Sequence, residues 1–124
     1  MTLALMSFSY KLGLPAQADI VLDVRFLKNP YYIPDLQKLS GLDAEIGPYI
    51  ESDPDFAIFY DHVTALLTTL LPRYLARDQP QFTIAVGCTG GRHRSVYMVQ
   101  KLSDFLSAQG YKAIISHRDL EKSL

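Results

Sequence analysis

The sequence predicts a small α/β domain in which four mostly parallel β-strands form one sheet flanked by helices. Short apolar, β-branched segments alternate along the chain with longer segments whose apolar residues recur at helical spacing. Apolar residues make up 48% of the chain and charged residues 20%, as in globular proteins, which argues against disorder. The 124 residues suffice for one well-packed core, and we expect residues 1–124 to form a single domain.

The first third of the chain carries two of the predicted strands. Residues 2–8 look apolar on both faces, as in a strand that is covered on both sides. Residues 15–19 are expected to form one short helical turn, and residues 20–26 form the second strand. Pro30 follows this strand closely, and residues 31–40 are predicted to be an ordered loop.

The middle of the chain is predicted to be helical. Residues 41–52 form a short helix. A second helix begins clearly at Asp53 and Pro54, because Asp is a favoured N-cap and Pro is favoured at the first helical position. Apolar residues then recur every three or four positions as far as Tyr74, which predicts a long helix facing the core. Pro72 lacks an N–H group and should kink or tighten its last turn.

The last third of the chain repeats the strand–helix–strand order. Residues 82–86 form a short, buried, β-branched strand. Residues 96–109 form an amphipathic helix, and Gly110 is the expected residue just after its end. Residues 112–116 form a strand at the edge of the sheet, and residues 117–124 form a polar tail.

Segment 87–95, Gly-Cys-Thr-Gly-Gly-Arg-His-Arg-Ser, joins a predicted strand to the beginning of a helix. Free backbone N–H groups and the positive end of the helix dipole favour an anion there. Two arginines and a histidine add donors that suit phosphate. The alternative is a tight turn with a solvated helix start, but arginine is unfavourable at a helix N-terminus unless an anion is present. We therefore predict a phosphate-binding loop formed by Thr89, Gly90, Gly91, Arg92, His93, Arg94 and Ser95.

Two other predicted strand ends should converge on this loop, because the carboxyl ends of parallel strands meet at one edge of a sheet. These are segments 7–11 and 23–29. Arg25 either points toward the ligand or forms a structural ion pair with Asp23, and the sequence leaves both open. Tyr31 and Tyr32 either stack on a sugar ring or cover the loop. The further candidates for the pocket are Ser7, Lys11 and Tyr31.

Cys88 allows another interpretation of the same loop. Cys88, five intervening residues, Arg94 and Ser95 match the C-x5-R-[ST] spacing of cysteine phosphatases. In those enzymes the thiolate attacks phosphorus and the arginine binds the phosphoryl oxygens. A cysteine at a strand end is more often a small buried core residue, and no aspartate can be assigned as the general acid. A phosphatase that uses Cys88 and Arg94 is therefore the second alternative.

Charge and composition limit the partners. The net charge of −1 gives no general attraction for nucleic acid, so RNA binding would need a local basic patch. No apolar run is as long as a membrane span, which needs about 20 residues. A signal peptide has a basic residue before its apolar segment, and none precedes the apolar N-terminus here. The single cysteine excludes an internal disulfide and fits a reducing compartment. We expect no membrane association, and we assign no metal and no cofactor. The candidate RNA contacts are Arg92, Arg94, Lys101, Lys112 and Arg118.

Five blocks occur in an order and spacing that resemble the C-terminal domain of the RapZ family, the bacterial RNase adapter and nucleotide-binding proteins. The similarity covers nearly the whole chain. The D-V-R-F-L block and the G-C-T-G-G-R-H-R-S block are far more specific than any single short motif. The five blocks are residues 7–11, 23–30, 40–43, 87–96 and 117–122.

The resemblance implies a cytoplasmic α/β domain, reminiscent of a phosphofructokinase subdomain, that senses glucosamine-6-phosphate and helps to bind small regulatory RNA. It also places Arg25 and Asn29 beside the phosphate loop. The nucleotide site of the family lies in an N-terminal P-loop domain, which this sequence lacks, so we expect a stand-alone domain without ATP or GTP binding. Three departures stand out. Tyr31 replaces a common histidine, Ser9 replaces a glycine, and the basic tail is missing, which weakens the case for RNA.

These observations together predict a sensor or adapter module rather than an enzyme. Its ligand is expected to be a phosphorylated small molecule, a phosphosugar such as glucosamine-6-phosphate. The first alternative is the RNA-binding module of an RNase adapter, with RNA or an RNA-processing protein as the partner. A homo-oligomer would align several copies of the basic residues and add avidity for RNA.

Overall fold

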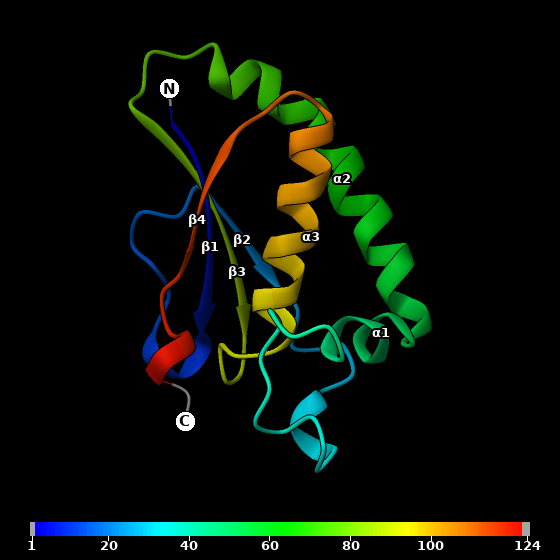
Figure 1. Ribbon diagram of the computed structural model, residues 1–124. Helices are drawn as coiled ribbons and strands as arrows, with labels where there is room; N and C mark the ends of the chain where they lie inside the picture. The colour runs from blue at the N-terminus through cyan, green and yellow to red at the C-terminus, as the bar shows by residue number, and fades with distance from the viewer. Residues whose placement is uncertain (1, 123–124) are drawn as a thin grey trace.

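The computed structural model describes residues 2–122, which form one small α/β domain with a four-stranded, all-parallel sheet in the order β2-β3-β1-β4. The predicted fold class is confirmed. Three short 3₁₀ turns accompany the main elements (Figure 1). The elements in chain order are β1 (Thr2–Ser9), η1 (Tyr10–Leu12), β2 (Ile20–Asp23), η2 (Pro30–Tyr32), α1 (Ile46–Glu51), α2 (Pro54–Leu75), β3 (Gln81–Cys88), α3 (Arg94–Ala108), β4 (Ala113–His117) and η3 (Leu120–Lys122).

The two long helices, α2 and α3, lie on the same side of the sheet (Figure 1). The main core lies between them and the strands, where Leu5, Ile84 and Leu102 are completely buried. Burial along the first part of β1 alternates, so that Leu3 and Leu5 are buried while Thr2, Ala4 and Met6 are half-buried. The expectation that this strand is covered on both faces is therefore wrong for its first residues. Among residues 2–122, no helix is both long and apolar enough to cross a membrane.

The second strand is shorter than predicted and ends at Asp23 rather than at residue 26. The Asp23 carboxylate accepts the backbone N–H of Arg25 at 2.9 Å, which closes an Asx-type turn and competes with the extended strand. Val24 still donates its N–H to the carbonyl of Gly87 at 2.9 Å, which holds the turn against β3. Residues 15–19 form a single hydrogen-bonded turn rather than a helical one.

Helix α1 begins at Ile46, five residues after the predicted start. The preceding residues form a capped turn, in which the N–H of Ser40 donates to Asp43 Oδ2 at 2.7 Å. Gly41 packs so closely on the beginning of α3 that a Cβ atom there would lie 2.4 Å from the nitrogen of Tyr97. Helix α2 begins as predicted, because Asp53 caps the N–H of Asp55 at 3.0 Å.

The last elements follow the prediction with small shifts. Helix α3 begins at Arg94, two residues early, and Gly110 has the positive φ of +88° expected just after a helix end. The prediction that the chain ends in a polar tail is wrong for residues 117–122, because His117 is the last residue of β4 and the Asp119 side chain is fully buried. The first residue and the last two residues of the chain lie outside the described residues.

Asp119 anchors the end of the chain to the end of β1. Its Oδ2 atom accepts the backbone N–H of Ser9 at 2.7 Å and is 2.8 Å from Nη2 of Arg118. Arg118 also donates to the carbonyl of Gly13 at 2.6 Å, on the other side of η1. Burial raises the pKa of Asp119, but the hydrogen bonds from Arg118 and Ser9 outweigh it, so the pKa lies below its ordinary value.

We predict that Asp119→Asn lowers the free energy of unfolding at pH 7 by about 2 to 3 kcal/mol, because a buried, charge-assisted network loses its acceptor. A lowered folded-state pKa contributes stability above the unfolded value of about 3.9, and that contribution disappears as the pH falls through the folded pKa. The difference in the free energy of unfolding between the variant and the wild type should therefore shrink below about pH 4. Urea unfolding across pH would measure it, with exposed Glu121→Gln as the control.

Candidate anion-binding site

A pocket of about 520 Å³ lies at the carboxyl edge of the sheet. Segments that follow β1, β2 and β3 all contribute to it, as the convergence of parallel strand ends predicts. The pocket has no carboxylate among its lining residues, so its charged groups all favour an anion. Its cationic side chains are Lys11, Lys38, Arg92 and Arg94, and its aromatic ones are Tyr31 and Tyr32.

The loop between β3 and α3, together with the first residue of α3, contributes residues 89–90 and 92–94 to the lining of this pocket, whereas Gly91 does not line it. Gly91 adopts a positive φ of +69°, and a Cβ atom there would lie 2.9 Å from Cβ of Ser9. Glycine is therefore required both for the backbone conformation and for the close approach to β1. The backbone N–H groups of residues 90–94 find no hydrogen-bond acceptor among residues 2–122. They are the orphan donors of a helix N-terminus, extended by a glycine turn.

Arg94 is the first residue of α3, and its side chain is only 4% exposed. Its Nη1 atom donates to the carbonyl oxygens of Arg25 and Leu27, in the segment after β2. Its Nε–H is buried and has no acceptor among the described residues. Burial lowers the pKa of the guanidinium, although arginine stays charged at physiological pH. Buried polar groups normally have a hydrogen-bond partner, so this unpartnered donor makes Arg94 a candidate for binding an anion.

Arg92 and His93 have different surroundings from Arg94. Arg92 is half-buried, donates through Nη2 to the carbonyl of Lys38, and also has a buried Nε–H without an acceptor in the described part of the chain. His93 is buried, and its Nε2 lies 3.2 Å from the carbonyl oxygen of Leu36. Burial lowers the pKa of His93, so the ring is neutral at pH 7 and ties the 33–39 loop to the site.

Thr89, Gly90 and Ser95 complete the predicted loop. Thr89 and Gly90 line the pocket, and the carbonyl of Thr89 accepts a hydrogen bond from the Ser9 hydroxyl at 2.6 Å. Ser95 does not line the pocket, because its side chain is fully buried with Oγ 3.1 Å from Sγ of Cys88. Cys88 itself lies at the floor, 2% exposed, and touches both the pocket and the core.

The candidates from the other strand ends divide into two groups. Lys11, Asn29 and Tyr31 line the pocket. Arg25 does not, because its guanidinium forms an ion pair with Asp23 at 2.7 Å and lies over the ring of Tyr10. Ser7 is buried away from the pocket and lies 2.7 Å from Nδ1 of His117. Lining residues Gln37 and Lys38 were missed by the sequence analysis, since exposed polar residues of an irregular loop carry no recognisable signal.

The candidate RNA contacts do not form one surface. Arg118 is engaged by buried Asp119, and Lys101 lies 3.5 Å from Glu51. Lys112 precedes β4, at the amino edge of the sheet, whereas Arg92 lies at the carboxyl edge. The structure therefore brings only Arg92 and Arg94 together.

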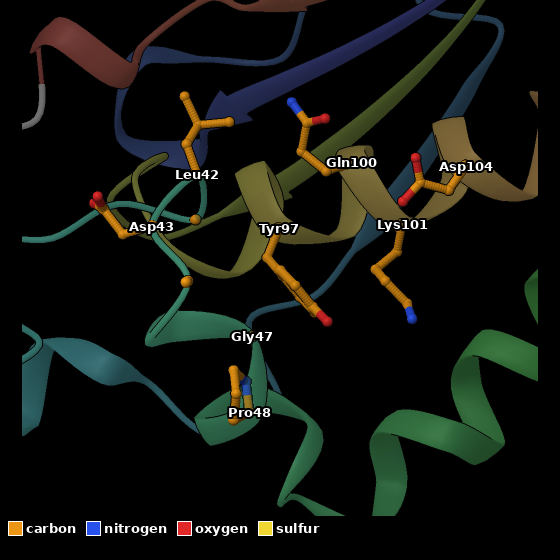
Figure 2. A pocket seen from close by; sticks show the side chains of 10 residues that line it. Leu42, Asp43, Gly47, Pro48, Tyr97, Gln100, Lys101 and Asp104 are labelled. Atoms are coloured by element: carbon orange, nitrogen blue, oxygen red, sulfur yellow. The ribbon is translucent and has the colours of Figure 1, made fainter.

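A second pocket, of about 370 Å³, lies between α3 and residues 41–48. Figure 2 shows Tyr97 and Lys101 projecting from α3 toward the segment that carries Gly47 and Pro48. Asp43 and Asp104 also line this pocket, and they would repel an anion. Burial raises the pKa of Tyr97, and the hydrogen bond that its hydroxyl donates to the Glu51 carboxylate raises it further. This second pocket is therefore less suited to phosphate than the one beside Arg94.

Comparisons with known proteins show what this chain is similar to. The model of the family described as the RapZ C-terminal domain matches residues 1–121. The chain is 52% identical over 120 residues to a nucleotide-binding protein of Granulibacter bethesdensis, covering 97% of the chain and 37% of that relative. It is 50% identical over 118 residues to a nucleotide-binding protein of Lactiplantibacillus plantarum, covering 95% of the chain and 40% of that relative. The chain thus spans well under half the length of these relatives.

The two glycines of the loop provide a matched test of its geometry. We predict that Gly91→Ala lowers the free energy of unfolding by about 2 to 3 kcal/mol, from the left-handed backbone conformation and the clash with Ser9. Gly90→Ala should change it by less than about 0.5 kcal/mol, since a Cβ atom there meets no other atom within 4 Å. Equal losses in chemical denaturation would contradict the conformation described for this loop.

Proposed function

The chain belongs to the RapZ C-terminal domain family, and we propose that it is a sensor or adapter module that binds a phosphorylated small molecule beside Arg94. The observation that carries the proposal is the buried guanidinium of Arg94, with its unpartnered Nε–H beside a pocket that has no carboxylate. On family grounds we place the protein in the cytoplasm.

A phosphate group suits this end of the pocket better than a carboxylate does. Its oxygens would accept from the Nε–H groups of Arg92 and Arg94 and from the free backbone N–H groups of residues 90–94. A tetrahedral, doubly charged group can use donors that converge from several directions, whereas a planar carboxylate can use fewer. The positive end of the α3 dipole adds to the attraction.

The rest of the ligand is proposed to be a sugar. The pocket is larger than a phosphate group, and its outer part carries Asn29, Tyr31 and Tyr32, which offer hydrogen bonds and the apolar ring faces that sugars stack on. Together with family membership, this favours a phosphosugar such as glucosamine-6-phosphate. Because Tyr31 stands where many relatives of the family have histidine, the contacts to the sugar ring are expected to differ from theirs.

We predict that Arg94→Lys weakens the binding of inorganic phosphate and of glucosamine-6-phosphate by about 10- to 100-fold, since lysine cannot hold the two carbonyls and the anion at once. Isothermal titration calorimetry would measure the dissociation constants. Arg73→Lys is the matched control, because Arg73 is exposed near the end of α2, and it should change binding by less than twofold. If neither compound binds the wild type, or if both variants behave alike, the proposal is wrong.

RNA or an RNA-processing protein is proposed only as a partner of an assembled adapter. The cations that line the pocket are Lys11, Lys38, Arg92 and Arg94, whereas a set of six to ten phosphate contacts needs as many converging cations. A homo-oligomer would repeat these cations and raise the avidity. The monomeric domain is therefore a weak RNA binder in this proposal.

We predict that the monomeric domain binds generic RNA with dissociation constants of roughly 10⁻⁴ to 10⁻⁶ M at physiological salt, in the range of non-specific binding. Gel shifts at several protein concentrations, together with sedimentation to establish the oligomeric state, would measure it. Sub-micromolar, sequence-selective binding by a demonstrated monomer would contradict this prediction and make the basic loop a recognition surface.

A further inference from the structure

In the structure, the C-x5-R-[ST] motif spans the end of a strand, a loop and the beginning of a helix. Cys88 is the last residue of β3, an inner strand of the sheet, and Arg94 is the first residue of α3. The loop between them turns at Gly91, and its backbone N–H groups have no acceptor among residues 2–122. Both Cys88, which is 2% exposed, and Arg94 line the same pocket, so a phosphoryl group bound by the arginine would share a cavity with the thiol.

Ser95 supplies a further feature of a reacting thiol. Its hydroxyl is completely buried, and its Oγ lies 3.1 Å from Sγ of Cys88. A hydroxyl at this distance can donate a hydrogen bond to a thiolate, which stabilises the sulfur both as the nucleophile and as the leaving group of a later step.

An independent observation shows that this pocket is built for a ligand. The buried Arg94 side chain, 4% exposed, keeps its Nε–H without an acceptor in the part of the chain that the structure describes. The donors are therefore in place to neutralise the oxygens of a phosphoryl group while its bond to the leaving group breaks. The positioned thiol and the positioned cation are the two parts that phosphoryl transfer to cysteine requires.

We propose that the protein hydrolyses phosphate monoesters through a phosphocysteine at Cys88. The inference rests on the proposed function, because it uses the same phosphate subsite. The thiol first loses its proton to solvent. The thiolate then attacks phosphorus, so that an S–P bond forms while the P–O bond to the leaving oxygen breaks, and that oxygen departs with the electron pair. Water next attacks phosphorus, the S–P bond breaks, the electron pair returns to sulfur, and the proton of the water passes to solvent.

The lining of the pocket limits the class of substrate. No Asp or Glu side chain lines it, so nothing there resembles the carboxylic acid that usually protonates an alkoxide leaving group. The reaction is therefore restricted to esters whose oxygen departs as a stable anion, which means aryl phosphates. Alkyl phosphates, including phosphosugars, bind at the same subsite but are not cleaved.

The test uses p-nitrophenyl phosphate, whose leaving group departs as a coloured phenolate. We expect turnover by the wild type, a loss of at least about 100-fold in Cys88→Ser and a loss of about 10-fold in Ser95→Ala. Ser107→Ala, on the exposed face of the same helix, should stay within twofold. Rapidly quenched samples should carry one phosphoryl group on the peptide that contains Cys88.

A second measurement avoids any dependence on folding of the variants. Cys88 is the single cysteine of the chain, so alkylation of the folded wild type by iodoacetamide modifies this thiol alone. It should abolish turnover, and inorganic phosphate should slow the modification.

The outcomes separate this inference from the proposed function. Binding of inorganic phosphate to the wild type and to Cys88→Ser within threefold of each other, without turnover by the wild type, would overturn the phosphatase and leave the sensor intact. Turnover that survives both Cys88→Ser and alkylation would also overturn it. Absence of both binding and turnover would overturn the inference and the proposed function together.

Discussion

The buried guanidinium of Arg94 is the interaction on which the architecture of the site depends. It joins the beginning of α3 to the carbonyls of Arg25 and Leu27, and thereby holds the segment after β2 against the loop after β3. A buried cation without a carboxylate partner is costly, and the two carbonyls offset only part of its desolvation. A bound anion would supply the remaining compensation, and its binding would then couple to folding stability through this one side chain.

The neighbouring contacts determine the shape around that cation. Gly91 lies directly against Ser9, so β1 sets how closely the loop can approach the sheet. Ser9 is in turn fixed through its backbone N–H by buried Asp119, near the end of the described chain. His93, neutral in its buried position, attaches the 33–39 loop through the carbonyl of Leu36. The site is therefore assembled from distant parts of the chain, although its most recognisable residues are consecutive.

The sequence predicted the fold class and the order of the strands and helices, because these depend on local periodicity and on glycine and proline signals. It also placed segment 87–95 at the junction of a strand and a helix, where the structure has it, while phosphate binding there stays a prediction. It could not predict features that depend on tertiary contacts. Asp119 looked like part of a polar tail because its burial depends on a partner more than 100 residues away. Arg25 was left open between two roles, and its contacts are with Asp23 and Tyr10. Lys38 lines the pocket but was not predicted, because it lies in an irregular loop that no sequence pattern marks.

A sensor and a phosphatase make opposite demands on a phosphate site, and the lining of this pocket can meet both. A sensor must bind its signal without consuming it, which requires that the alkoxide of a phosphosugar remain a poor leaving group. The absence of a carboxylic acid from the lining preserves such a ligand, even when the thiol of Cys88 lies close to phosphorus. An aryl phosphate needs no proton from the protein, so the same thiol and the same arginine would cleave it. In this scheme the leaving group, rather than the phosphate site, decides whether a compound is bound intact as a signal or is hydrolysed.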